Sequence, residues 1–176
     1  DFKEADGRQQ IIEIWNDVFM QYEQQGGEVV GQLNQKNVDT GAGLERLAMV
    51  LQGVDNIFAT DLFAPIMNEI DERKSVDNQK AERVVADHIR TAVFITADGV
   101  QPDNSGRGYV LRRILRRAVE FGDKLGLSDE DLLALITPVI EMYKGWYHNI
   151  EENEDAIRKI IAEETQNFRE TLKRGK

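Results

Sequence analysis

The sequence contains no cysteine, and it has only three prolines and two histidines among its 176 residues. Without cysteine the chain has no disulfide framework, no thiolate nucleophile and no cysteine-based metal site. The two histidines, His88 and His148, lie far apart in the sequence, which argues against a zinc site. No hydrophobic run is long enough to span a membrane, and no signal peptide opens the chain. We therefore expect a cytoplasmic protein with no membrane partner and no metal site in this chain.

Positive charge is in deficit as well. The chain has 22 Lys and Arg against 32 Asp and Glu, which gives a net charge of −10. Such an acidic chain repels nucleic acid at long range, so an RNA partner would have to meet a local basic surface. The segment RGYVLRRILRR, residues 107–117, offers one, because it holds five arginines and no acidic residue.

The first third of the chain has the pattern of a β-hairpin followed by a helix. Residues 11–22 are rich in β-branched and aromatic types with partial alternation, which favours a strand. The pair Gly26-Gly27 indicates a hairpin turn, with a second strand after it. Gly41 and Gly43 predict a turn that leads into an amphipathic helix over 43–52.

The remainder of the chain predicts helices only. Helical spacing of apolar residues runs through the segments 61–72, 80–97, 108–121, 128–146 and 150–173. Ser128 has the position of an N-cap, and Pro138 predicts a kink or a break. Residues 97–108 are dense in turn formers and predict a loop. The expected fold is α+β, mostly α, with a short antiparallel sheet followed by a helical bundle and with domains over 1–56 and 57–176.

The basic segment becomes two-sided when it is placed on a helix. At about 100° per residue, the side chains of four arginines fall within an arc of roughly 140°. These are Arg112, Arg113, Arg116 and Arg117, and the remaining arc holds Val110, Leu111, Ile114, Leu115, Ala118 and Val119. Like charges on one face favour an anion or acidic helices opposite them. The residues alone leave two interpretations open, a phosphate-backbone contact and a solvated face paired by internal salt bridges.

The loop before the basic helix presents Asp103, Asn104 and Ser105. Asn or Ser at this place is suited to capping the helix, which is the more ordinary role. The Asn104 amide also carries a donor and an acceptor, so it is suited to recognising a base edge in the wide, shallow minor groove of RNA. His88 lies near an apolar stripe without a catalytic arrangement around it, and it is predicted to be a core or boundary histidine.

Four blocks of the sequence, in order, resemble one family. DTGAGLERLAMVLQ, residues 39–52, is similar to motif 3 of class II aminoacyl-tRNA synthetases, a strand–helix unit with the pattern G-x-G-x-E-R. EIWNDVFMQY at 13–22, ADHIRTAVFITADGV at 86–100 and GRGYVLRRILRRA at 106–118 resemble the alanyl-tRNA synthetase family in particular. The resemblance covers almost the whole chain. It implies the ATP-dependent attachment of alanine to its tRNA.

The resemblance also implies roles for residues of the first part. The implied substrate- and ATP-binding residues are Asn16, Val18, Asp39, Gly41, Gly43 and Arg46. Arg46 matches the arginine that lies over the adenine ring, and Asp39 matches the aspartate that holds the alanine ammonium group. Gly41 matches the glycine that lets the backbone approach the substrate, and Asn16 and Val18 match residues that line the alanine pocket. No residue of this piece is expected to act as an acid, a base or a nucleophile.

The helical part resembles the tRNA-recognition domain of the family. Its implied tRNA-binding residues are Asn104, Arg107, Arg112, Arg113, Arg116 and Arg117. Asn104 matches an asparagine that contacts the G·U wobble pair of the alanine tRNA acceptor stem. An aspartate that completes this contact in the family is expected beyond Lys176.

Motifs 1 and 2 of the family are expected before residue 1, and an editing domain is expected after the last residue. The sequence is thus interpreted as a piece of a longer chain that is inactive by itself. ATP with Mg²⁺ is expected as a substrate of the intact enzyme, with alanine, the alanine tRNA acceptor stem and the rest of the synthetase chain as partners. One alternative is a non-catalytic RNA-binding helical module related to the synthetase. Another is a structural helical domain whose arginines are paired internally.

Overall fold

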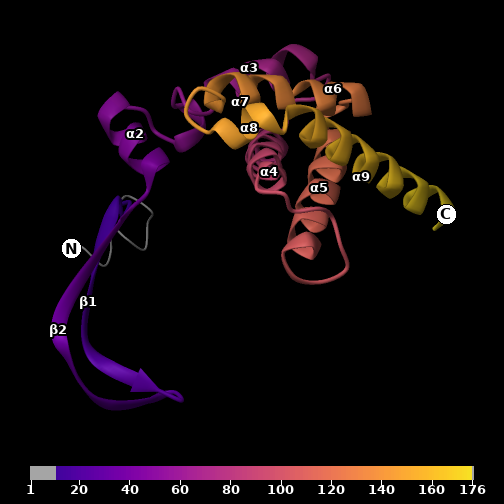
Figure 1. The fold of residues 1–176 in the computed structure, drawn as a ribbon. Coiled ribbons are helices and arrows are strands. Elements are labelled where there is room, and N and C mark those ends of the chain that lie inside the picture. The colour runs from indigo at the N-terminus through magenta and orange to yellow at the C-terminus, as the bar shows by residue number, and fades with distance from the viewer. Residues whose placement is uncertain (1–10, 176) are drawn as a thin grey trace. The chain divides into compact units, whose positions relative to one another are not determined.

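The computed structural model describes residues 11–175. They fall into two compact units, which divide between Thr60 and Asp61. The first unit holds a two-stranded antiparallel sheet and a helix, and the second is built from helices (Figure 1). The predicted fold class, α+β and mostly α, is confirmed. The functional roles assigned to the two predicted domains stay predictions.

The first unit begins with a hairpin of strands β1, Trp15–Gln25, and β2, Glu28–Ala42. The predicted turn is confirmed, because Gly26 and Gly27 join the strands with φ angles of 61° and 92°. Two register shifts occur along the ladder, and the paired strands curve (Figure 1). The predicted strand started at residue 11, but β1 starts at Trp15. Its partner there is Ala42, after which the chain leaves the sheet.

Gly41 and Gly43 do not form the predicted turn. Gly41 lies within β2, and Gly43 is the N-cap of helix α2, Leu44–Gln52, with extended φ and ψ of −83° and 108°. Any residue can adopt this conformation, so the strand continues directly into the helix cap. The glycine that does need a left-handed conformation is Gly53, which ends α2 with φ 65°. A short 3₁₀ helix, η1, follows over Ile57–Ala59.

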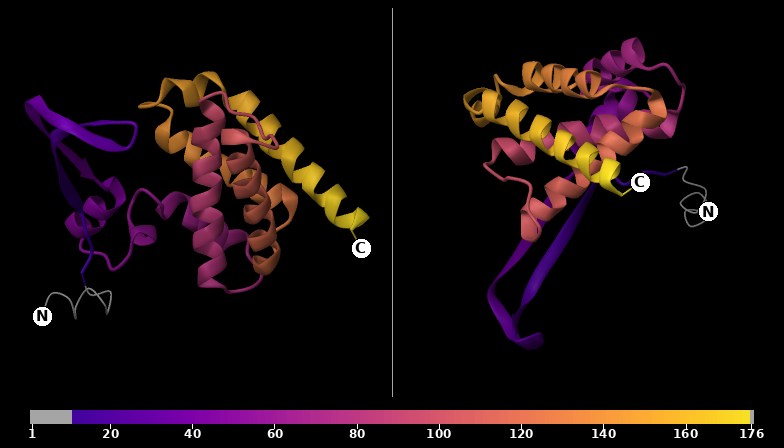
Figure 2. Two further views of the ribbon diagram at one scale, coloured as in Figure 1. Left: turned by 90° about the horizontal axis from the view of Figure 1, so that it is seen from below. Right: turned by 90° about the vertical axis from the view of Figure 1, so that its right-hand side faces the viewer.

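The second unit contains only helices among its described residues, as predicted. They are α3 Ala64–Arg73, α4 Gln79–Ala97, α5 Gly106–Leu125, α6 Asp129–Ala134, α7 Ile136–Tyr143, α8 His148–Glu152 and α9 Glu154–Arg174. Helix α5 packs along α4, and α9 contacts both (Figure 2). The core lies between these elements and α7, with Val85, Ile89, Val93, Leu111, Leu115, Ile136, Ile140, Ile157 and Ile161 buried.

Two predicted helices are interrupted in the structure. Ser128 caps α6 in a capping box with Asp131, as predicted, and a break at Leu135 separates α6 from α7 three residues before Pro138. The last predicted helix is divided at Asn153, whose φ and ψ of −107° and 15° are not helical. The Asn153 amide donates to the backbone carbonyls of Ala97 and Asn149, at 3.3 Å and 2.9 Å. These bonds hold the break in place.

The buried stripe of α5 is narrower than the sequence predicted. It consists of Gly108, Leu111, Leu115, Ala118, Val119, Gly122 and Leu125. Val110 and Ile114 were placed on the packed face, but Val110 is 49% exposed and Ile114 is half-buried. The stripe is set by two close approaches: a Cβ on Gly108 would meet the Gln101 carbonyl at 2.5 Å, and one on Gly122 would meet Leu132 at 2.8 Å.

Candidate functional site

Register in the hairpin brings four of the predicted substrate-binding residues together. Asn16 lies opposite Gly41, and Val18 lies opposite Asp39. Directly paired residues of an antiparallel ladder share a face, and residues two apart on one strand share it as well. The side chains of Asn16, Val18 and Asp39 therefore lie on one face of the sheet, beside the bare backbone of Gly41. The pairing over 16–18 and 39–41 comes before the register shifts, so the alternation is regular here.

Glu13 connects this face to the start of α2. The Asn16 amide donates to the Glu13 carboxylate at 3.3 Å, and the Arg46 guanidinium donates to the Glu13 backbone carbonyl at 2.9 Å. The Gly43 amide donates to the Ile14 carbonyl at 3.0 Å, so the helix N-terminus is tied to the same segment. Glu13 could not be predicted from the sequence, because its contact to Arg46 uses the main chain and leaves no residue-type pattern.

The two glycines of this segment differ in what surrounds them. A Cβ on Gly41 would lie 3.5 Å from the Asn16 side-chain oxygen, which is ordinary contact. A Cβ on Gly43 would lie 3.2 Å from the Arg46 Cδ, which is tight. The space above Gly43 is thus used by the Arg46 stem as it folds back toward Glu13. At Gly41 an added Cβ would touch only the Asn16 side chain among the described residues, without a clash.

The opposite face of the hairpin has a polar pair of its own. Thr40 lies opposite Asp17, and its hydroxyl donates to the Asp17 carboxylate at 2.7 Å. Asp17 and Asp39 are thus two exposed aspartates of the same hairpin on opposite faces. Asp17 can therefore serve as a matched control for Asp39 in experiments on the face that carries Asn16.

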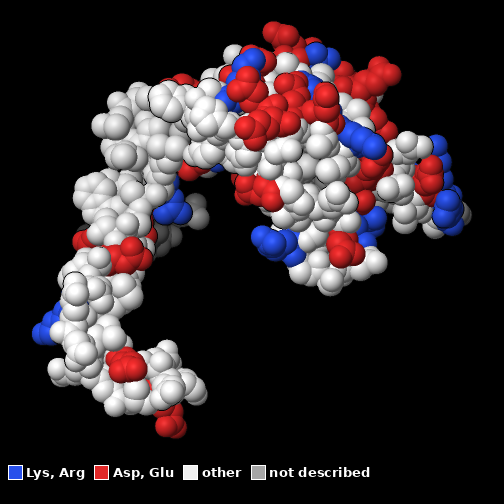
Figure 3. Space-filling view, in the orientation of Figure 1, with Lys and Arg blue, Asp and Glu red and all other residues white. Residues whose placement is uncertain are grey.

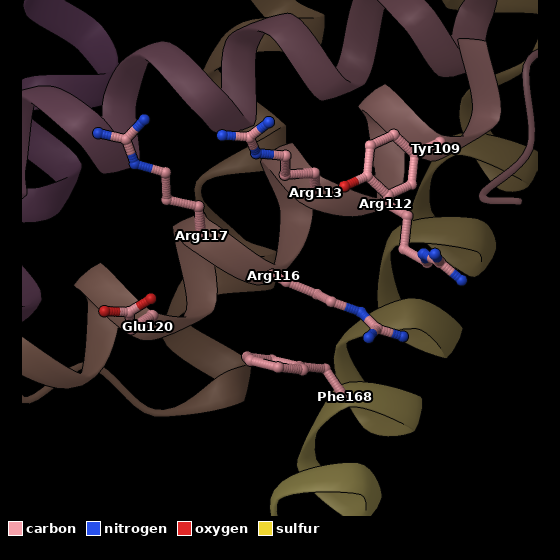
Figure 4. Close-up of a pocket in the computed structure, with 7 residues that line it drawn as sticks. All are labelled: Tyr109, Arg112, Arg113, Arg116, Arg117, Glu120 and Phe168. Atoms are coloured by element: carbon pink, nitrogen blue, oxygen red, sulfur yellow. The ribbon is translucent and has the colours of Figure 1, made fainter. Parts of the chain in front are cut away.

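The second group of predicted residues lies on α5. Side chains of Tyr109, Arg112, Arg113, Arg116, Arg117, Glu120 and Phe168 line a surface pocket of about 340 Å³. The four arginines do not form one cluster. Arg113 and Arg117 point together to one side of α5, whereas Arg112 and Arg116 point toward α9 (Figure 4).

The pair that points toward α9 is held by protein contacts. Arg116 donates to the Glu164 carboxylate at 2.7 Å, and its guanidinium lies 5.3 Å from the Phe168 ring centre. The Glu164 side chain is only 8% exposed, so this ion pair is partly desolvated. Arg112 donates to the side-chain oxygen of Asn104 and lies 5.6 Å from the Tyr109 ring centre. Internal pairing was one of the two open interpretations, and it applies to Arg116.

The other pair has no acidic partner within residues 11–175. Arg113 forms no ion pair there, and the guanidinium of Arg117 lies 5.4 Å from the centre of the Phe121 ring. Arg107, in the first turn of α5, forms no ion pair with the described residues either. In Figure 3 acidic side chains gather on the side of this unit formed by α3, α6 and α7. Three guanidiniums on α5 are therefore not neutralised by neighbouring carboxylates.

Asn104 and Ser105 do not cap α5 with their side chains. The N-cap is Ser105, and its side chain makes no capping hydrogen bond. The Asn104 backbone amide donates to the Asp103 carboxylate at 2.6 Å, while the Asn104 side chain contacts Arg112. The ordinary role considered for these residues is therefore absent from this structure.

His88 lies beside Arg113 and Arg117, which we call the free arginine pair. Its ring Nδ1 is 2.9 Å from the Asp87 carboxylate, and its side chain is 14% exposed. Together with Tyr109, Val110, Arg113, Ile114 and Arg117 it lines a second surface pocket of about 240 Å³. The sequence predicted a boundary histidine, and its partial burial agrees with that description.

The described residues contain no group of three or more His, Cys, Asp or Glu side chains that could hold a metal ion. In the same part of the chain, every helix is too short or too polar to cross a membrane.

Comparison with known proteins adds an independent finding. The family model described as "tRNA synthetases class II (A)" matches residues 3–176. The chain is 43% identical over 173 residues to the alanine–tRNA ligases of Staphylococcus aureus strains JH9 and Newman. The matched region covers 95% of this chain and 20% of each ligase. The chain therefore spans about a fifth of the length of the curated relatives it matches.

Proposed function

This chain belongs to the class II tRNA synthetase family, and from that premise we propose that it is part of an alanine–tRNA ligase. The first unit would supply the motif 3 side of the alanine and ATP site. The second unit would recognise the acceptor stem of the alanine tRNA. The 43% identity to alanine–tRNA ligases supports alanine as the amino acid.

The hairpin register is the observation that carries the catalytic part of this proposal. It places a carboxylate, an amide and a small apolar side chain on one face, beside a glycine. The Asp39 carboxylate would accept hydrogen bonds from the ammonium group of alanine, with Asn16 next to it. Val18 would limit the size of the pocket, and Gly41 would let the substrate lie against the backbone. Such a pocket excludes larger amino acids by sterics but rejects glycine and serine poorly.

Arg46 would bind the adenine ring of ATP through its planar guanidinium. The bond to the Glu13 carbonyl and the contact with Gly43 hold its side chain across the start of α2. The described residues offer no cluster of carboxylates or imidazoles for Mg²⁺, so the Mg²⁺ that accompanies ATP is assigned no ligand here.

In the proposed reaction the alanine carboxylate attacks the α-phosphorus of ATP and pyrophosphate leaves. The alanyl group then passes to the 3′ end of the tRNA. Residues of this chain would bind and orient the ammonium group and the adenine, and none would form a covalent intermediate.

Alanine-dependent ATP–pyrophosphate exchange tests this role in the full-length protein that contains the chain. Removing the Asp39 carboxylate should raise the KM for alanine by roughly tenfold or more, because the bound ammonium group would lose its charged partner. Asp17→Ala is the matched control on the other face, and its KM for alanine should change little. Equal effects of Asp39→Ala and Asp17→Ala would contradict the assignment of this face.

The tRNA-recognition part of the proposal is supported by the unpaired arginines of α5. Guanidiniums of Arg107, Arg113 and Arg117 are available for phosphate oxygens, which a planar guanidinium binds well. Asn104 lies at the start of the same helix, where its amide would contact the acceptor-stem base pair. Binding of an alanine-tRNA acceptor hairpin at low salt is the expected result. No binding at low salt would contradict this role.

The rest of the synthetase chain is the proposed protein partner of the first unit. Large apolar side chains on both faces of the hairpin are exposed, among them Trp15, Val18, Phe19, Val29 and Val38. A two-stranded hairpin gains stability by packing against further elements. These exposed side chains support a further layer of protein over the hairpin in the intact enzyme, which we place in the cytoplasm.

A second candidate is a non-catalytic RNA-binding module. One observation favours it: the second unit has its own core and carries all of the proposed tRNA-binding residues. The two candidates differ in the full-length protein. Binding of the acceptor hairpin without any alanine-dependent exchange would favour the module over the ligase.

A further inference from the structure

The contact between Arg112 and Asn104 fixes the orientation of the Asn104 amide. The Arg112 guanidinium donates a hydrogen bond to the Asn104 side chain. A guanidinium has only donors, so the atom that it contacts must be the carbonyl oxygen of the amide and not the nitrogen. The amide NH₂ group of Asn104 then lies on the other side, away from Arg112. Asn104 thus presents its hydrogen-bond donors to a partner, while its oxygen already accepts from Arg112.

We propose that Arg112 is a positioning residue, which holds the Asn104 amide in the orientation that recognises the acceptor-stem base pair. Arg112 would act through Asn104 and would not itself contact a phosphate. This inference rests on the proposed function, in which Asn104 contacts that base pair. It also separates Arg112 from Arg113, the neighbouring arginine that has no acidic partner among the described residues.

The surroundings of the two residues support a fixed geometry. The loop before α5 passes so close to Gly108 that a Cβ there would meet the Gln101 carbonyl and Asp103. The Asn104 backbone amide is bonded to the Asp103 carboxylate at 2.6 Å. Arg112 is half-buried and lies near the Tyr109 ring. The loop backbone and the Arg112 stem are thus both restrained, and their contact restrains the Asn104 side chain.

A base-pair preference measures this role. Two acceptor hairpins that differ only in G·U or G·C at the recognised pair are titrated with the protein, and the ratio of their Kd values is the readout. In the wild-type protein the ratio favours G·U. Asn104→Ala should reduce the ratio by about fivefold or more, which is the discrimination that one base contact typically supplies. Arg112→Met keeps the aliphatic stem but cannot donate, and it should reduce the ratio by a similar factor.

A double-mutant cycle and a matched arginine complete the experiment. In the Asn104→Ala background, Arg112→Met should cause no further loss, because both changes remove the same contact. Arg113→Ala is the matched control, and it should weaken both hairpins alike, as expected for a phosphate contact. Arg112→Met that weakens both hairpins alike and keeps the ratio would overturn the proposal, since Arg112 would then be a phosphate ligand.

A measurement without RNA separates this proposal from the proposed function. ¹⁵N relaxation of the Asn104 side-chain amide should show an ordered group in the wild-type protein and a mobile one in Arg112→Met. An amide that is equally mobile in both proteins would overturn the positioning role even if Asn104 binds RNA. An Asn104→Ala variant that keeps the full G·U preference would overturn both the positioning role and the proposed function of Asn104.

Discussion

The two units differ in where their large apolar side chains lie. In the hairpin Trp15 and Phe19 are 55% and 75% exposed, whereas in the helical unit Leu115 is 1% exposed and Ile140 is fully buried. A two-stranded sheet has two faces and no second layer of its own, while α4, α5, α7 and α9 bury their stripes against one another. The hairpin therefore presents its face residues without a core beneath them, and the helical unit holds its arginines on a core.

The candidate sites of the two units also differ in what positions their residues. In the hairpin, main-chain register alone brings Asn16, Val18 and Asp39 to one face. On α5, side-chain contacts decide which arginines are free, because Arg116 is held by Glu164 and Arg112 contacts Asn104. Single side-chain changes should consequently alter stability more in the helical unit.

The largest expected effect is a cavity in the helical core. Leu115→Ala removes a buried side chain of α5 and should lower the free energy of unfolding by about 2–5 kcal/mol. Phe19→Ala removes a larger but mostly exposed side chain, and it should change the free energy by about 0.5 kcal/mol or less. Urea titrations followed by helical circular dichroism measure both. Similar losses in the two variants would break the contrast between the units.

A smaller effect is expected where the loop crosses α5. Gly108→Ala places a Cβ within 2.5 Å of the Gln101 carbonyl, so the loop backbone must move. The expected loss is about 1–3 kcal/mol, as for other overpacked sites. Gly31→Ala in β2 is the matched control, because no atom lies within 4 Å of the added Cβ. Thermal melting of the two variants checks the prediction, and an unchanged Tm in Gly108→Ala would count against the close approach.

The smallest effect concerns the cap of α6. Hydrogen bonds from the Ser128 hydroxyl and backbone amide, together with Arg73, lower the pKa of Asp131 below its usual 3.8. A lowered pKa gives stability that is present above pH 3.8 and is lost as the pH falls through the folded-state value. Ser128→Ala should cost about 1 kcal/mol near neutral pH.

Part of that cost should disappear as the pH falls toward the folded-state pKa of Asp131, because its carboxylate then loses charge and only the hydroxyl cap is missing. Urea titrations of wild-type and Ser128→Ala protein at pH 7 and near pH 3 measure the change. A cost that grows as the pH falls would contradict the sign of the pKa shift.

Local patterns predicted the elements of the fold well. Gly26-Gly27, the Ser128 cap and the helical spacing of α3, α4 and α5 each depend on residues close together in sequence. The interpretation of Gly41 and Gly43 as a turn was wrong. Glycine permits a positive φ but does not require one, and here β2 continues directly into the cap of α2.

The candidate site was predictable only in part. The sequence placed four arginines within one arc of a helix, and all four do lie within the helix α5. It could not show that they divide into a free pair and a partnered pair, because Glu164, Phe168 and Asn104 reach them only through tertiary packing. Predicting which residues share a face of the hairpin required the strand register. The structure supplies that register through the pairing of Asn16 with Gly41.

The free arginine pair is tested most directly by the salt dependence of RNA binding. The affinity for the alanine-tRNA acceptor hairpin is measured against salt concentration for the wild type and for the double variant Arg113→Ala, Arg117→Ala. Each lost phosphate contact should lower the slope of log Kd against log salt by about one. Arg158→Ala is the control, because Arg158 is paired with Glu154 on α9. We predict a slope lower by about two in the double variant and an unchanged slope in the control. An unchanged slope in the double variant would contradict it.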